Sequence, residues 1–125
     1  MRILIVEDSP LVQSMYGLAF SRREHELTTA NDGREAVARL DDPASMFDVV
    51  LLDLRMPGMN GVDFLREVRR RARWAKLPIV LTTIEPDSSE LLTEAKRLGV
   101  LAVVKKPWHP QQLHDLVEAI VHPGK

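Results

Sequence analysis

The stretch that decides the fold is Asp48-Val49-Val50-Leu51-Leu52-Asp53-Leu54-Arg55-Met56-Pro57-Gly58. Its apolar run, Val49–Leu52, is unbroken, which is typical of a parallel strand buried on both faces. The run ends at the carboxylate of Asp53, and Pro57-Gly58 then marks a turn. Ligands of open α/β sheets bind at the carboxyl ends of the strands. We therefore expect Asp53 to lie where the chemistry of this protein takes place.

Outward from this stretch, strand-like and helix-like segments alternate five times along the chain. Strands are predicted at 2–6, 25–30, 49–52, 78–83 and 100–104. Helices are predicted at 10–20, 35–40, from about 62 onward, at 86–98 and at 110–121. Such alternation implies right-handed crossovers and a parallel sheet with helices on both of its faces. The whole chain, 1–125, is expected to form one α/β domain.

The composition narrows the class of protein. The chain has 125 residues, 45% of them hydrophobic and 28% charged, with a formal net charge of −1 and no cysteine. This balance gives no general attraction to nucleic acid or to an anionic membrane. The absence of cysteine fits a reducing compartment. No apolar run approaches the ~20 residues of a membrane span, so we expect a soluble, cytoplasmic protein.

Polar groups follow each of the strands that should lie at the centre of the sheet. They are Glu7 and Asp8 after the first strand, Asp53 after the third, Thr83 at the end of the fourth, and Lys106 after the fifth. Parallel strands bring all of these groups to the same edge of the sheet. Three carboxylates in one crevice repel one another, and Mg²⁺, or Mn²⁺ in its place, would relieve the repulsion. Asp53 could then act as a nucleophile that forms an acyl phosphate.

In this order and spacing, these residues resemble the receiver domain of bacterial two-component response regulators. The matching motifs are the acid pair Glu7-Asp8, Asp53 within Asp-Leu-Arg-Met-Pro-Gly-Met-Asn-Gly, Thr83, and Lys106-Pro107. The resemblance covers the chain from end to end, and the chain is similar to stand-alone regulators of the chemotaxis type. It implies a doubly wound, flavodoxin-like sheet of five strands in the order 2-1-3-4-5, flanked by five helices.

The resemblance also implies roles for single residues. Asp53 would be the phosphoacceptor, with Thr83 and Lys106 as its catalytic partners. Asp8, Asp53 and the backbone carbonyl of Arg55 would bind Mg²⁺, and Glu7 would act through water. The Lys106–Pro107 bond would be cis, a form that X-Pro bonds can adopt.

Partners follow from the same resemblance. A sensor histidine kinase or a histidine phosphotransfer protein would supply the phosphoryl group. A downstream protein would bind the surface formed by 86–98, 100–104 and 110–121, and a phosphorylation-dependent dimer is compatible with this scheme. No direct binding to DNA or membranes is expected, and catalysis would be limited to self-catalysed phosphotransfer and slow autodephosphorylation.

Four positions depart from the family pattern or vary within it. Val103 stands where the family has an aromatic switch residue, so a ring that turns inward cannot be assumed. Ile84 stands where a small side chain is usual and should hinder access to the pocket. Arg55 and Glu85 occupy two variable positions beside the pocket, where their opposite charges could pair and tune access.

Two neighbouring residues compete for assigned roles. Thr82 is a rival for the hydroxyl of Thr83, and Lys105 is a rival for the ammonium of Lys106. Adjacent strand residues point to opposite faces, so only one of each pair can reach the crevice. The distance from Pro78 favours Thr83, and the position directly before proline favours Lys106.

Other functions were weighed against this interpretation. An aspartyl phosphatase would need a second acid two residues after the nucleophile, where this chain has Arg55. A nucleotide or flavin module would need a glycine-rich phosphate loop, which follows none of the predicted strands. A degenerate receiver that binds partners without phosphorylation is kept open by Val103.

Some features have simpler structural interpretations. The basic run 66–74 could bind nucleic acid, but it is more typical of the solvated face and last turn of a helix, where cations favour the helix dipole. Among the four histidines, only His109 and His114 have a spacing that hints at a metal, and all four are expected at the surface. Trp108 could be a partner-surface residue or a cover at the start of the last helix.

Overall fold

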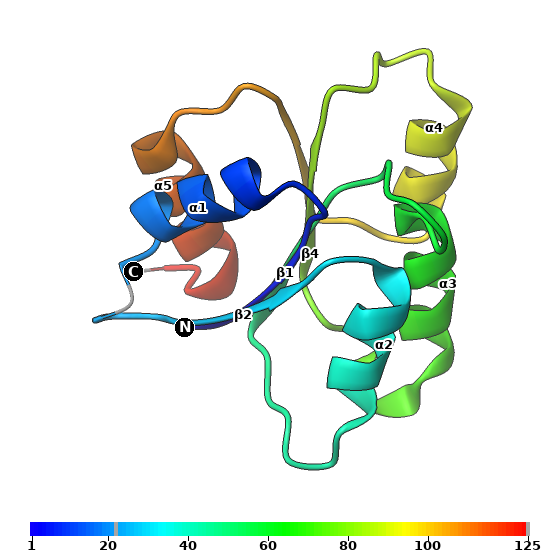
Figure 1. The fold of residues 1–125 in the computed structure, drawn as a ribbon, viewed down its shortest axis with the longest axis horizontal. Helices are drawn as coiled ribbons and strands as arrows, with labels where there is room; N and C mark the ends of the chain where they lie inside the picture. The colour runs from blue at the N-terminus through cyan, green and yellow to red at the C-terminus, as the bar shows by residue number, and fades with distance from the viewer. Residues whose placement is uncertain (22, 125) are drawn as a thin grey trace.

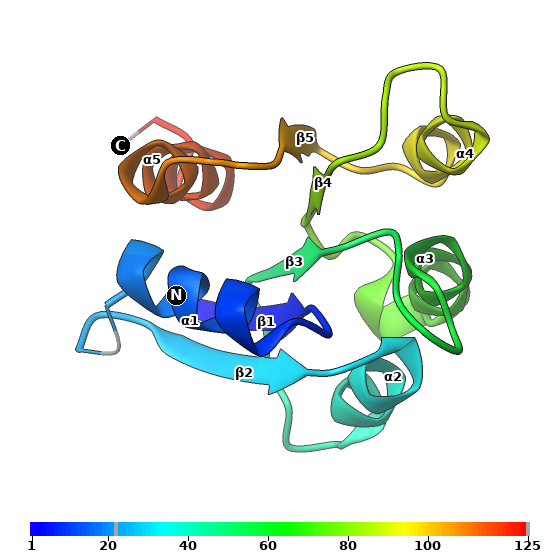
Figure 2. The same cartoon turned by 45° about the horizontal axis from the view of Figure 1, so that its top comes forward.

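The computed structural model describes residues 1–21 and 23–124. Within them, a parallel sheet of five strands has the order β2-β1-β3-β4-β5, and its strands alternate with five α-helices (Figures 1 and 2). The strands are β1 (Arg2–Val6), β2 (Glu26–Ala30), β3 (Val49–Leu52), β4 (Ile79–Thr83) and β5 (Ala102–Lys105). The helices are α1 (Pro10–Ala19), α2 (Gly33–Asp41), α3 (Gly61–Arg70), α4 (Glu90–Arg97) and α5 (Pro110–Val121). The predicted fold class and strand order are confirmed.

The central strands are buried on both faces because their side chains alternate between two hydrophobic layers. Leu51 packs in the layer beneath α1 and α5, and its neighbour Leu52 packs in the layer beneath α2, α3 and α4. Figure 2 shows the two helical layers on opposite sides of the sheet. Both side chains are fully buried, which explains why this strand has no polar position to reveal its alternation. In the described part of the chain, every helix falls short of the length and apolar character that membrane crossing requires.

Polar caps fix where the helices begin, and these caps lie on the edge of the sheet that carries the candidate site. The side chain of Ser9 accepts a hydrogen bond from the backbone N–H of Val12 at the start of α1. Asn60 caps α3 in the same way, through the backbone N–H of Asp63. Such caps satisfy backbone donors that the first turn of a helix leaves without partners. They also fix the direction in which each loop leaves its strand.

The start of the fourth helix was predicted wrongly. We expected the helix from Pro86, but α4 begins at Glu90. The backbone N–H of Ser89 donates to the carbonyl of Pro86, which closes a turn at this point. The Ser89 side chain then accepts from the backbone N–H of Leu92 and caps the helix. A serine cap three residues downstream therefore prevails over the proline as the helix start.

Two other boundaries differ from the prediction. The fifth strand runs from Ala102 to Lys105 rather than from 100 to 104, because Val80 pairs with Ala102 and Thr83 pairs with Lys105. The third helix ends at Arg70, and a separate 3-10 helix follows at Ala72–Trp74. The buried Trp74 donates its ring N–H to the carbonyl of Leu40. This contact turns the end of the basic run into a covering segment over the core.

Gly61 is the point where α3 approaches the end of β3 most closely. A Cβ atom at this position would lie 2.6 Å from the carbonyl oxygen of Asp53 and 2.8 Å from Cα of Leu54. A Cβ atom at Gly17, in the last turn of α1, would by contrast meet nothing within 4 Å. Position 61 therefore has no room for a side chain, whereas position 17 does.

We predict that Gly61→Ala lowers the free energy of unfolding by about 1–3 kcal/mol, because the added methyl group overpacks against backbone. Gly17→Ala should raise it by about 0.5–1 kcal/mol, because alanine is the better helix former. Urea denaturation of the two variants measures both effects. Equal changes in the two variants would contradict the close approach at Gly61.

Candidate functional site

Three carboxylates meet at the carboxyl edge of the sheet. Glu7 and Asp8 follow β1, and Asp53 follows the adjacent strand β3, to which β1 is paired from Ile3 to Val6. One oxygen from each carboxylate lies within 4.8 Å of the others. Glu7 and Asp53 are 1% and 8% exposed, whereas Asp8 is open to solvent. The predicted convergence of these acids is observed.

Lys106 brings a positive charge to the same place from the end of β5. Its ammonium nitrogen Nζ donates to Glu7 Oε2 at 3.0 Å and lies 3.6 Å from Asp53 Oδ2. The peptide bond that follows, Lys106–Pro107, is cis as the family resemblance implies. A single ammonium group thus faces two buried carboxylates, with the third close by.

The pKa values of the buried acids reflect this shortage of positive charge. Burial raises the pKa of Asp53 above its ordinary value, and the nearby charge of Asp8 raises it further. Lys106 and the backbone N–H of Arg55 lower it, but only in part. Burial likewise raises the pKa of Glu7, against the opposing hydrogen bond from Lys106. The crevice therefore stabilises added positive charge.

The two rivalries left by the sequence have a clear geometric outcome. Thr82 points into the core, where its hydroxyl is 2.5 Å from the hydroxyl of Tyr16. Thr83 ends β4 on the other side of the strand, and its hydroxyl accepts from the backbone N–H of Glu85. Lys105 turns toward the loop after β4, where its ammonium contacts the carbonyl of Glu85. Lys106 rather than Lys105 faces the acids.

The charges of Arg55 and Glu85 pair beside the crevice. Arg55 Nε lies 2.6 Å from Glu85 Oε1, on an arginine side chain that is 67% exposed. Among the described residues, that oxygen has no hydrogen-bond donor aligned on it, so the contact is an ion pair rather than an aligned hydrogen bond. Exposure of the arginine screens the pair and limits its value to under about 1 kcal/mol.

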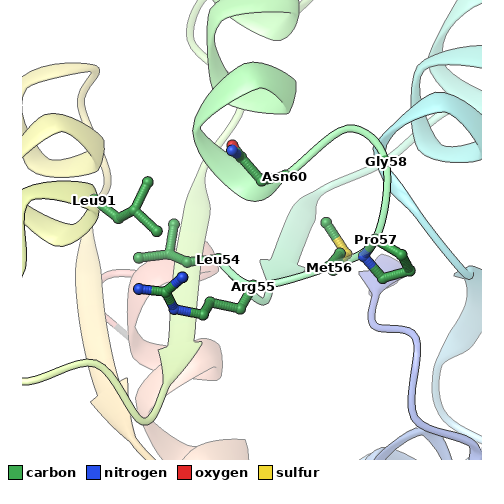
Figure 3. Close-up of a pocket in the computed structure, with 7 residues that line it drawn as sticks. All are labelled: Leu54, Arg55, Met56, Pro57, Gly58, Asn60 and Leu91. Carbon is green, nitrogen blue, oxygen red and sulfur yellow. The ribbon is translucent and has the colours of Figure 1, made fainter.

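A hollow of about 340 Å³ lies next to the site rather than at Asp53 itself. Its wall consists of the loop after β3 and one residue of α4: Leu54, Arg55, Met56, Pro57, Gly58, Asn60 and Leu91. Figure 3 shows Leu54 and Arg55 directed toward Leu91, and Met56 and Pro57 on the other side of the loop. Asp53 is not part of this wall, so the acids and not the hollow define the candidate site.

Two family departures are placed by the structure. Ile84 is 74% exposed and directly follows Thr83. Val103 is partly buried and packs against the hydrophobic layer beneath α2, α3 and α4. It is paired with Leu81 in the middle of β4.

The sequence model of one protein family, the response regulator receiver domain, matches residues 3–118 of the chain. The chain belongs to this family. It is 34% identical to the chemotaxis protein CheY1 of Helicobacter pylori over 122 residues, which cover 97% of each chain. It is also 37% identical to the regulatory protein AtoC of Escherichia coli over 117 residues, which cover 94% of this chain and 24% of that protein. The solved structure of CheY4 of Vibrio cholerae aligns with a TM-score of 0.84 at 32% identity, over 95% of this chain and 97% of that one.

Receiver domains bind Mg²⁺ at an acidic pocket, and the donor set of this receiver suits that ion. The acids offer hard oxygen ligands, which Mg²⁺ prefers over nitrogen or sulfur. The raised pKa values of Asp53 and Glu7 are the sign that their charges lack full compensation. A divalent cation at this crevice would supply it, held by Glu7, Asp8 and Asp53.

The prediction from the sequence was wrong for one histidine, and it did not include one residue that supports the acidic loop. His25 was expected at the surface, but it is 7% exposed. Gln13 of α1 donates to the carbonyl of Glu7 at 2.6 Å and so holds the start of the acidic loop; a glutamine one turn into a helix carries no pattern that would have revealed this. Trp108 is a cover rather than an exposed partner residue: it is 8% exposed and its ring centroid lies 4.9 Å from that of Tyr16.

We predict that Asp53→Asn makes the metal-free receiver more stable near neutral pH. Because its folded pKa is raised, Asp53 favours the fold while protonated and loses that contribution as the pH rises through the folded value. The gain of the variant should disappear below about pH 4, where aspartate is protonated in both states. Thermal unfolding in a metal chelator across this pH range measures it. A variant less stable than the wild type at neutral pH would contradict the conclusion that the buried carboxylates lack compensating positive charge.

Proposed function

We propose that this receiver is a phosphoacceptor, in which Asp53 takes a phosphoryl group from a phosphohistidine in the presence of Mg²⁺. The convergence of Asp53, Glu7, Asp8 and Lys106 in one crevice is the observation that carries the proposal. We further propose that the receiver unit extends over the whole chain, 1–125.

The geometry supports Asp53 as the acceptor among the three acids. Glu7 is engaged by the ammonium of Lys106 and by the backbone N–H of Ser9. Asp8 is exposed to solvent. Asp53 follows directly on the buried strand β3. Its hydrogen bond from the backbone N–H of Arg55 is long, at 3.4 Å, and Lys106 Nζ lies 3.6 Å away. Its carboxylate is therefore the one that is both rigidly placed and weakly engaged.

The proposed step forms one bond and breaks one. An oxygen of the Asp53 carboxylate attacks phosphorus, the P–N bond of the phosphohistidine breaks, and the leaving imidazole takes up a proton from solvent. When bound, Mg²⁺ would neutralise charge on the phosphoryl oxygens. Lys106 would supply a positive charge to the same oxygens. The Thr83 hydroxyl, which accepts from the backbone N–H of Glu85, has its own proton to donate to them, and a shift toward them would loosen that contact with Glu85.

Loss of the Thr83–Glu85 contact offers a route for the signal that does not need an aromatic residue at 103. Glu85 is linked on one side to Arg55 and on the other, through its carbonyl, to Lys105 of β5. A shift of Thr83 toward a phosphoryl group would therefore be passed to the loop before α4 and to β5. Phosphorylation would bias the α4–β5–α5 surface only as far as the phosphoryl group prefers one arrangement over the other.

The partners we propose are those of receivers in general. A sensor histidine kinase or a histidine phosphotransfer protein would donate the phosphoryl group in the cytoplasm, and a downstream protein, or a second copy of the chain, would bind the α4–β5–α5 surface. Hydrolysis would regenerate Asp53 when water attacks phosphorus and the Asp53 O–P bond breaks.

We predict that the chain gains the mass of one phosphoryl group when incubated with Mg²⁺ and acetyl phosphate. Asp53→Asn should abolish this gain, because the amide is not a nucleophile of this kind. Intact-protein mass spectrometry measures both. A chelator should also prevent the gain in the wild type.

Asp63→Asn is the matched control, because it removes an exposed acid that pairs with Arg66 on α3 and is not one of the three clustered carboxylates. It should be phosphorylated like the wild type. Phosphorylation that persists in Asp53→Asn would place the acceptor elsewhere and refute the proposal.

We predict that Ile84→Ala shortens the lifetime of the phosphorylated protein severalfold. We propose that the exposed branched side chain, directly after Thr83, shields the phosphoryl group, so its removal should admit attacking water more readily. Release of inorganic phosphate after removal of the donor measures the rate. Equal rates in the variant and the wild type would show that Ile84 does not guard the phosphoryl group.

A further inference from the structure

A second group of potential ligands lies away from the acidic crevice. His25, directly before β2, meets His114 and Glu118 on α5, with one ligand atom of each residue within 4.8 Å of the others. His114 and Glu118 are four residues apart and so share one face of the helix. The first residues of β2 and the last turns of α5 lie on the same side of the molecule (Figure 1).

The three side chains converge on the carboxylate. Glu118 Oε1 lies 4.0 Å from His25 Nε2 and 3.9 Å from His114 Nε2. Ligands of a tetrahedral zinc ion with bonds of about 2.0–2.2 Å are separated by roughly 3.3–3.5 Å. Small rotations of the side chains would therefore bring the three atoms to that spacing. The ring of Phe20 lies 5.7 Å from each imidazole, centroid to centroid, and forms an apolar wall beside them.

An independent observation points to a ligand. His25 Nε2 is buried and has no hydrogen-bond partner among the described residues, on a side chain that is only 5% exposed. Buried polar atoms without partners are rare because leaving them unsatisfied is unfavourable. Burial also lowers the pKa of His25, as does the nearby amino group of Met1. The imidazole is therefore neutral at physiological pH, which is the form that binds metal.

The surroundings of His25 are compatible with metal binding at Nε2. The amino group of Met1 lies 3.1 Å from the other ring nitrogen, Nδ1. Metal-bound histidines donate a hydrogen bond through their second nitrogen. Metal binding at Nε2 would therefore place the ring proton on Nδ1, and the Met1 amino group would release a proton and accept from it. Glu24 Oε2, on an exposed side chain, lies 3.9 Å from Nε2 and can reach a metal from the solvent side.

We propose that His25, His114 and Glu118 form a binding site for a divalent transition metal, which we assign as Zn²⁺. Two imidazoles and one carboxylate are a typical zinc ligand set with a fourth position left for water. Mg²⁺ prefers oxygen ligands and is not expected there. The ion would fasten the edge strand β2 to α5. This site shares no ligand with the acidic crevice, so it does not depend on phosphorylation of Asp53.

The test is a calorimetric titration of the untagged full-length chain with Zn²⁺ in an excess of Mg²⁺, which occupies the acidic crevice. One equivalent should bind, and His114→Gln and Glu118→Gln should each weaken binding by about tenfold or more. Both side chains are partly exposed, at 24% and 29%, so the variants should fold, which circular dichroism verifies. His109→Asn is the matched control, since it removes an exposed histidine and keeps a good helix cap; it should bind like the wild type.

Thermal unfolding gives a second readout. Zn²⁺ should raise the unfolding temperature of the wild type by roughly 5–10 °C at a hundredfold excess over its dissociation constant. The shift should be absent from Glu118→Gln. Failure of the wild type to bind Zn²⁺ would overturn the proposal. So would binding that survives both α5 variants but is lost in Asp8→Asn, because the ion would then occupy the acidic crevice.

Discussion

Glu7 and Asp53 are two buried acids that face one ammonium group, that of Lys106, and the rest of the site follows from this imbalance. Burial makes their charges unfavourable, and Asp8 adds a third carboxylate within 4.8 Å. The fold holds them together because β1 and β3 are paired neighbours and end at the same edge. The hydrophobic layers on both faces of the sheet thus stabilise a cluster that electrostatics alone would disperse. A divalent cation, alone or with a phosphoryl group, would relieve the repulsion between carboxylates that the fold holds together.

The alternation of strand residues separates the functional side chains from the structural ones. In β4, Thr82 binds Tyr16 in the core while the Thr83 hydroxyl accepts from the backbone N–H of Glu85. At the end of β5, Lys105 reaches the loop before α4 while Lys106 reaches the acids. One residue of each pair thereby anchors the sheet, and the other remains available for chemistry.

Much of this architecture could be predicted from the sequence. The unbroken apolar run 49–52 required a central strand, and the βα alternation required a parallel sheet whose carboxyl ends meet. That constraint is sufficient to bring Asp53, Glu7, Asp8 and Lys106 together. Helix boundaries were less predictable, because Pro86 and Ser89 are both acceptable starts and only the hydrogen bond between their backbones selects the serine.

By itself the sequence determined the sheet, the order of its polar ends and the family to which the chain belongs, since these depend on local pattern and on the geometry of parallel strands. Only the tertiary structure decided contacts between side chains that lie far apart in the sequence. His114 and Glu118 could be placed on one helical face from their spacing, but His25 joins them across 89 and 93 residues through the packing of α5 beside the start of β2. Tyr16 reaches Thr82, 66 residues further along the chain, for the same reason. Such contacts depend on how whole elements pack, which no periodicity along the chain records.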